Sequence, residues 1–131
     1  MIHPSTFLSR ALLADAIFSG VAVALTLGAG ALAPFLNLPE ALLRETGLFL
    51  IAYTALVGWL ASRSSVPKAL VLLVIVGNAA WTLGSIALLF SGAVSPNLLG
   101  QVFIVAQAIA TGVFAELQYI GLRKSGGVVT A

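Results

Sequence analysis

The sequence predicts an all-α fold, a transmembrane bundle of four antiparallel helices with both termini in the cytoplasm. Of its 131 residues, 60% are apolar and only 8% are charged, and the mean hydropathy is +1.13. Soluble domains carry about 25% charged residues, and a soluble domain of this size would not bury so much apolar surface. Four apolar segments are each long enough to cross a bilayer, which takes about 20 residues. We therefore expect an integral membrane protein.

Short loops with polar residues or proline separate the four expected spans. Pro39 separates the first span from the second, and Pro67 separates the second from the third. Ser95, Pro96 and Asn97 provide a helix N-cap for the last span, with proline in its first turn. Loops this short make neighbouring helices run antiparallel. The expected spans cover residues 11–36, 41–62, 68–91 and 97–122.

The two ends of the chain need separate interpretations. We assign residues 1–124 to the four-helix transmembrane domain and expect residues 125–131, which contain a Gly-Gly pair, to be a disordered tail. An Ala-Leu-Ala run at 31–33 resembles a signal-peptide cleavage site. However, Pro34 would follow the cut, and the apolar core is longer than that of a signal peptide. We therefore expect the first segment to remain as a span.

Basic residues are concentrated on one side of the expected bundle, which sets its orientation. Only Arg44 falls on the far side. The positive-inside rule therefore predicts that both termini and the middle loop are cytoplasmic. The basic residues on that side are Arg10, Arg63, Lys68, Arg123 and Lys124.

Polar residues recur at helical spacing within the spans and form narrow stripes on apolar helices. Hydrogen bonds between membrane helices are the simplest interpretation of such stripes. A polar cavity or path through the bundle is the alternative. The candidate residues for an intramembrane polar site are Asp15, Ser19, Thr26, Tyr53, Asn78, Thr82, Gln107, Thr111, Glu116 and Gln118.

Two of these candidates, Asp15 and Glu116, are ionisable, and a charge in hydrocarbon costs about 2.5–3.5 kcal/mol on insertion scales. They lie at similar depth in the first and fourth spans, which are neighbours in an up-down bundle. The two acids therefore either share a pocket, or Glu116 points to the helix flank, because it is half a turn from Gln107. Their role is either helix packing or the handling of a proton or cation. Asp15 begins a continuous stripe and is expected to face the interior.

Small residues form a further pattern, recurring at helical spacing in the first and third spans. Such faces let helix backbones approach closely within one chain, or dock onto a second copy or another membrane protein. Both interpretations stay open. The residues are Ala16, Gly20, Ala24 and Gly28 in the first span, and Gly77, Ala80, Gly84 and Ala87 in the third.

Several classes of function lack the residues that they need. Cysteine is absent and His3 is the one histidine, so a haem, diiron or zinc site has too few ligands. Ser19 and Ser85 have no histidine or lysine within reach to activate them as nucleophiles. Basic residues do not cluster, which argues against nucleic-acid binding. We expect no enzymatic activity and no cofactor.

The segments RALLADAIFSG and AELQYIGLRK, with NAAW in the third span, resemble small four-helix bacterial inner-membrane proteins of uncharacterised function. That resemblance implies the inner membrane as the location and implies no biochemical role. A weaker analogy links Asp15 and Trp81 to the small multidrug resistance transporters, which have an acid in the first helix and a tryptophan in the third. This chain departs from them by using Asp where they use Glu, and by carrying Glu116.

The function expected from the sequence is that of a non-enzymatic accessory or interaction subunit, or of a self-associating bundle. The expected partners are the lipid bilayer and either a second copy or another membrane protein. The alternative is a carrier or binder of a small molecule or cation, coupled to protons through the intramembrane carboxylates. A carrier needs a titrating carboxylate that water can reach, whereas a packing role does not.

Overall fold

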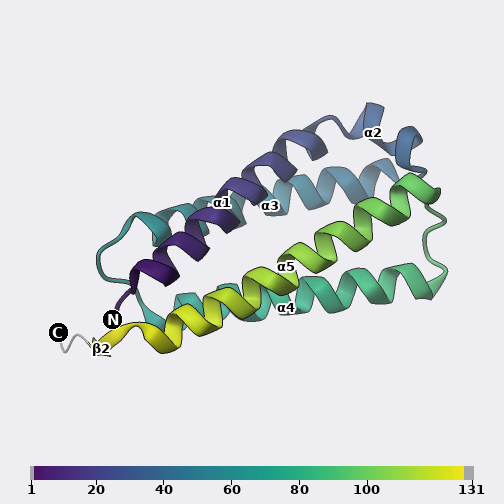
Figure 1. The fold of residues 1–131 in the computed structure, drawn as a ribbon. Helices are drawn as coiled ribbons and strands as arrows, with labels where there is room; N and C mark the ends of the chain where they lie inside the picture. The colour runs from purple at the N-terminus through teal and green to yellow at the C-terminus, as the bar shows by residue number, and fades with distance from the viewer. Residues whose placement is uncertain (1, 129–131) are drawn as a thin grey trace.

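The computed structural model describes residues 2–128, which form helices, two short strands and the loops that connect them. Four of the helices are long and apolar enough to cross a membrane, and they form an elongated bundle (Figure 1). The structure thus confirms an all-α fold with four candidate spans and fits a small integral membrane protein. The elements are β1 (Ile2–His3), α1 (Thr6–Leu27), α2 (Ala29–Leu36), α3 (Glu40–Ser62), α4 (Lys68–Ser91), α5 (Leu98–Lys124) and β2 (Gly126–Val128).

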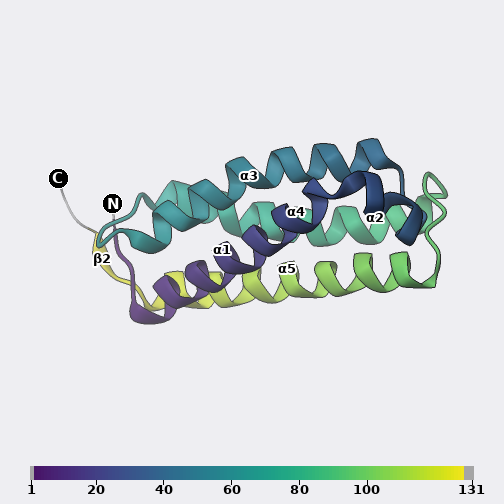
Figure 2. The ribbon, with the colours of Figure 1, turned by 90° about the horizontal axis from the view of Figure 1, so that it is seen from above.

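The two ends of the described chain, β1 and β2, and the α3–α4 loop meet at one end of the bundle, which we call the terminal end (Figures 1 and 2). The strand β1 pairs antiparallel with β2, and the amides of Ile2 and Val66 donate to each other's carbonyls at 2.8 and 2.9 Å. The opposite end holds α2 and the α4–α5 loop, where the amide of Asn97 donates to the carbonyl of Leu36 at 3.2 Å.

Part of the tail that was expected to be disordered forms regular structure. Residues 126–128 form β2 and pair with β1. A Gly-Gly segment has no side chains to pack, but its backbone amides and carbonyls form hydrogen bonds with a paired strand. This pairing orders the segment. Residues 129–131 of the expected tail lie outside the described residues.

The first expected span, 11–36, is two helices in the structure. The helix α1 ends at Leu27, and α2 begins after Gly28, whose amide bonds back to the carbonyl of Leu25 at 3.2 Å. At 1.5 Å per residue a straight helix over 11–36 would measure about 39 Å, longer than a hydrocarbon core of about 30 Å. Glycine lets the chain turn there, and α2 accommodates Pro34 within a short helix.

The boundaries of the other three spans agree with the sequence to within two residues at each end, and α4 covers 68–91 as expected. The helix α1 begins at Thr6, five residues before the expected start of the first span. Asn97 alone is the N-cap of α5, and its Oδ1 accepts a hydrogen bond from the amide of Gly100 at 2.8 Å. The expectation that Pro96 lies in the first helical turn is wrong, because Pro96 precedes the cap.

The helices pack unevenly, and this determines where a site can form. The helix α1 packs against α3 and α5, and α4 packs against α5, whereas the backbones of α3 and α4 stay apart. Buried apolar side chains fill the terminal half of the bundle, and a second apolar cluster lies at the opposite end. The first cluster contains Leu8, Leu12, Val57, Leu60, Val71 and Val74, and the second contains Ala33, Leu36, Leu43 and Ile104.

Candidate functional site

The carboxylate of Asp15 is the centre of a buried polar network to which each of the four long helices contributes. Asp15 is 1% exposed. Its Oδ1 accepts a hydrogen bond from Ser19 at 3.1 Å. Its Oδ2 accepts from Tyr53 on α3 at 2.7 Å, Asn78 on α4 at 2.9 Å and Gln118 on α5 at 2.7 Å. The structure thus brings together five of the candidate residues.

Every partner of Asp15 in this network donates to it. A carboxylate offers about four lone-pair sites, and four donors converge on this one, three of them on Oδ2 and one on Oδ1. The amide of Asn78 also donates to Oε1 of Gln118 at 2.9 Å, which locks the two amides into one orientation. Because a buried polar group is costly unless it is hydrogen-bonded, this network holds the four helices in one register.

Two threonines form a separate polar contact between α4 and α5. The hydroxyls of Thr82 and Thr111 lie 2.7 Å apart, and Thr82 also donates to the carbonyl of Ala108 at 2.8 Å. This contact lies about one turn from the Asp15 network, because Thr82 is four residues from Asn78 on the same helix. It joins the same helix pair without involving a charge.

The remaining candidates, Thr26, Gln107 and Glu116, lie outside the network. The hydroxyl of Thr26 donates to the carbonyl of Ala22 in its own helix at 2.8 Å. Glu116 is exposed on the outer face of α5, so it shares no pocket with Asp15. The guanidinium of Arg123 lies over the ring of Tyr119, 5.9 Å from its centroid, and forms no ion pair with Glu116 in the described part of the chain.

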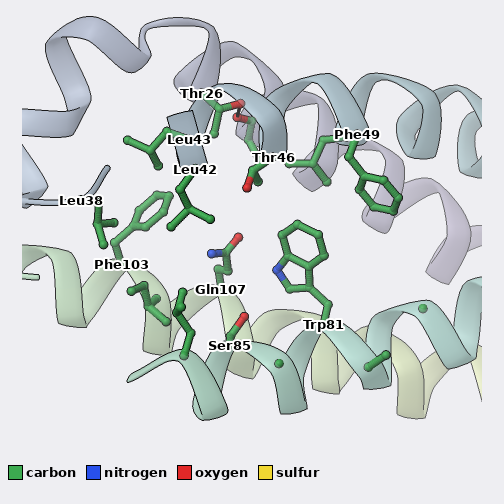
Figure 3. A pocket seen from close by; sticks show the side chains of 17 residues that line it. Thr26, Leu38, Leu42, Leu43, Thr46, Phe49, Trp81, Ser85, Phe103 and Gln107 are labelled. Carbon is green, nitrogen blue, oxygen red and sulfur yellow. Dashed lines mark hydrogen bonds between the residues drawn. The ribbon is translucent and has the colours of Figure 1, made fainter. Parts of the chain in front are cut away.

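A partly open cavity of about 520 Å³ occupies the gap between α3 and α4 in the half of the bundle away from the termini (Figure 3). Phe49 and Trp81 stack across this gap with their ring centroids 5.8 Å apart. A smaller cavity of about 60 Å³ adjoins it and reaches Tyr53 and Asn78 of the Asp15 network. The two cavities share Ala22, Phe49, Leu50, Gly77, Trp81 and Gln107.

Besides Thr26, whose hydroxyl is bonded within its own helix, four polar side chains from three helices line the larger cavity, in walls that are otherwise mostly apolar (Figure 3). They are Thr46, Trp81, Ser85 and Gln107. Within residues 2–128, none of the four side chains has a hydrogen-bond partner. Binding pockets typically measure about 300–1,000 Å³ and combine apolar walls with a few polar groups that fix a ligand's orientation. This cavity has both properties.

Three of the small residues of α4, Gly77, Ala80 and Gly84, line the cavity instead of packing against a neighbouring helix. A Cβ built on Gly77 or Gly84 would have no atom within 4 Å. On α1 the pattern does serve packing, since a Cβ on Gly20 would lie 3.9 Å from the methyl group of Thr54. The same sequence pattern therefore has a different role in each of the two helices.

Thr46 was not among the candidates from the sequence, although Tyr53 on the same helix was. On another face of α3, Gly47 lies against Thr26 of α1. Thr46 shares the face of Tyr53 at a spacing of seven residues, which is the signal that identifies it as a cavity residue.

No protein-family model matches the chain, and comparisons with curated proteins and with solved structures find no match. The class of protein therefore follows from the fold and the site alone. Four apolar helices, a buried polar network and a lateral cavity fit a small multi-pass integral membrane protein.

Proposed function

We propose that the protein binds a small, mainly apolar molecule that carries a hydrogen-bonding group. The molecule enters from the bilayer between α3 and α4 and occupies the 520 Å³ cavity. One observation carries the proposal, namely the convergence of unpartnered polar groups from Thr46, Trp81, Ser85 and Gln107 on one apolar space. Such groups gain a partner when a ligand binds, and they select against a ligand without polar atoms.

The geometry supports binding better than proton-coupled transport. Asp15 is absent from the linings described for the cavities, and it already accepts hydrogen bonds from four donors of the chain itself. A ligand at the inner end of the cavity would meet Tyr53 and Asn78, which lie between it and the carboxylate. We therefore assign Asp15 to helix packing and the polar cavity groups to recognition.

The expected role as an accessory or interaction subunit has less support from this part of the molecule. One motive for it was the small-residue face of α4, and Gly77 and Gly84 of that face line the cavity. We also propose that this binding protein is not an enzyme. The residues described in the cavity lining offer hydrogen bonds, but they do not place a base beside a nucleophile.

We propose that the protein lies in a bacterial inner membrane with antiparallel helices, and that its terminal end is in the cytoplasm. Support for this orientation comes from the basic residues gathered at that end, where the side chains of Arg63 and Lys124 lie over the rings of Trp59 and Phe7. Basic and aromatic residues mark the cytoplasmic interface of membrane proteins.

Fluorescence of Trp81 tests the proposed binding, with 4-bromophenol as an apolar probe that carries a hydroxyl and bromobenzene as a matched probe without one. The Trp59→Phe variant, in lipid vesicles, leaves Trp81 as the one tryptophan in the sample. We expect saturable quenching by 4-bromophenol at lower concentrations than by bromobenzene. The Trp81→Phe variant, which retains Trp59, reports simple partitioning of the probes into lipid.

Two glycine variants make the experiment specific for the cavity. Leucine at Gly84 fills the cavity, and leucine at Gly58 is its matched control, because neither site has an atom within 4 Å of a built Cβ and Gly58 lies outside the described linings. We expect Gly84→Leu, and not Gly58→Leu, to abolish saturation. Linear quenching, or equal quenching in the two variants, would contradict the proposal.

A further inference from the structure

Glu116 occupies a costly position on the surface of the bundle. It lies about 12 Å along the axis of α5 from Lys124, at 1.5 Å per residue, and its side chain is exposed. Its neighbours on the same outward stripe are Ile109, Val113 and Ile120, each between 43% and 62% exposed. Among the described residues the carboxylate has no ion pair and no hydrogen bond. An acid facing lipid in this way needs a partner from outside the chain.

Arg10 has the complementary chemistry on the neighbouring helix. It is exposed on α1, one turn from the start of the helix. The cations of Arg63, Arg123 and Lys124 each lie over an aromatic ring, whereas Arg10 has no ring, acid or hydrogen-bond partner within residues 2–128. Its outward stripe continues through Ile17 and Val21, which are 61% and 57% exposed.

The two stripes border the same groove, so that Arg10 and Glu116 belong to one face of the molecule. The groove, of about 400 Å³, separates α1 and α2 from α5 in the half away from the termini. Val21 continues the Arg10 stripe into the groove, and Val102 and Ala106 continue the Glu116 stripe into it. We call this surface the α1/α5 face.

We propose that the α1/α5 face is the contact surface between two copies of this chain, with Glu116 of each copy paired with Arg10 of the partner subunit. A two-fold interface brings residue i to residue j and j to i. A face that carries one acid and one base of this kind therefore complements itself and forms two pairs at once. The apolar groove beside the charges leaves room for side chains of the second copy.

Charge complementarity favours a second copy over another occupant. A lipid chain would fill the groove and leave the carboxylate of Glu116 unpaired. A different protein would need its own cation at the depth of Glu116, whereas this chain already supplies Arg10 within about 5 Å of that depth. The difference in depth follows from the contact of Leu8 with Gly121, which places these two residues at the same level. From that level, Arg10 lies two residues along α1 and Glu116 lies five residues along α5, at 1.5 Å per residue. The inference does not depend on the proposed ligand.

Single-molecule photobleaching in vesicles of phosphatidylethanolamine and phosphatidylglycerol tests the proposal. We expect two-step bleaching in wild type, and an increase in the dimer dissociation constant of at least about tenfold in Glu116→Gln or Arg10→Gln, because each change removes both pairs. The combined Arg10→Glu and Glu116→Arg exchange restores the dimer. Glu45→Gln is the control, an exposed acid at the opposite end that leaves dimerisation unchanged.

Cross-linking with a bismaleimide on the cysteine-free chain gives an independent measurement. Ile17→Cys lies on the α1/α5 face, and Leu73→Cys on α4 has a matched exposure, 58% against 61%. We expect a cross-linked dimer from the first variant and monomer from the second. Monomeric wild type, cross-linking through both positions, or capture of a different protein by the Ile17→Cys variant would each overturn the proposal.

Discussion

Asp15 accepts four hydrogen bonds and donates none in the structure, which changes what its substitution is expected to do. Asparagine has the shape of aspartate, but it replaces one acceptor oxygen with a donor that would face other donors. A buried donor without a partner costs about 1–3 kcal/mol. The role of Asp15 in the network is therefore that of an acceptor, and an isosteric amide does not fill it.

We expect Asp15→Asn to lower the free energy of unfolding by about 1–3 kcal/mol, and Asp15→Leu to lower it further, because leucine removes the acceptor of all four hydrogen bonds. Denaturant titration in mixed micelles measures both values. Ser85→Ala is the control, since that hydroxyl has no partner among the described residues. Equal stability of Asp15→Asn and wild type would show that the donors rearrange around the amide.

At the scale of the helices, α1 and α5 meet through a glycine. A Cβ built on Gly121 would lie 2.7 Å from the Cα of Leu8, a backbone atom that cannot move aside as a flexible side chain can. Next to this contact, the Oγ of Ser5 donates to the carbonyl of Gly121 at 3.0 Å, so the N-cap of α1 is also tied to α5.

Gly121→Ala is expected to destabilise the bundle by about 1–3 kcal/mol, the usual cost of overpacking. Gly58→Ala, with open space around the built Cβ, is expected to be neutral or to stabilise by up to about 1 kcal/mol through helix propensity. Thermal unfolding in detergent compares the two variants. A neutral Gly121→Ala would mean that the two helices separate at little cost.

Local sequence signals identified most helix boundaries, and the exceptions have a physical reason. Pro67 precedes the start of α4 and Gly92, with a φ of 76°, follows its end, so both limits of that helix were predictable. The break at Gly28 was not predictable, because the apolar segment continues through it. A glycine inside an apolar run can indicate either a bend or a close contact between helices.

The polar residues of the candidate site were identifiable, but their grouping was not. Asp15, Asn78 and Gln118 belong to different helices, and which stripes meet depends on the rotation of each helix about its axis. The cavity left no distinct signal either, because Gly77 and Gly84 have the same spacing as residues that pack helices together.

The whole molecule has two ends with different chemistry, and its orientation can be measured on the cysteine-free chain. Ser64→Cys lies at the terminal end and Ala93→Cys at the opposite end, both exposed. We expect a membrane-impermeant maleimide to label Ala93→Cys in intact cells and Ser64→Cys only after permeabilisation, following the positive-inside rule. Labelling of Ser64→Cys in intact cells would reverse the orientation.

The separation of the network residues along the chain has a consequence for biosynthesis. The donors to Asp15 emerge from the ribosome in turn, Ser19 four residues after it, then Tyr53, Asn78 and Gln118 at separations of 38, 63 and 103 residues. At a synthesis rate of about 5–20 residues per second, Gln118 is made roughly 5–20 s after Asp15. The nascent first helix is therefore expected to remain at the insertion machinery, or in contact with a chaperone, until the last helix has been made.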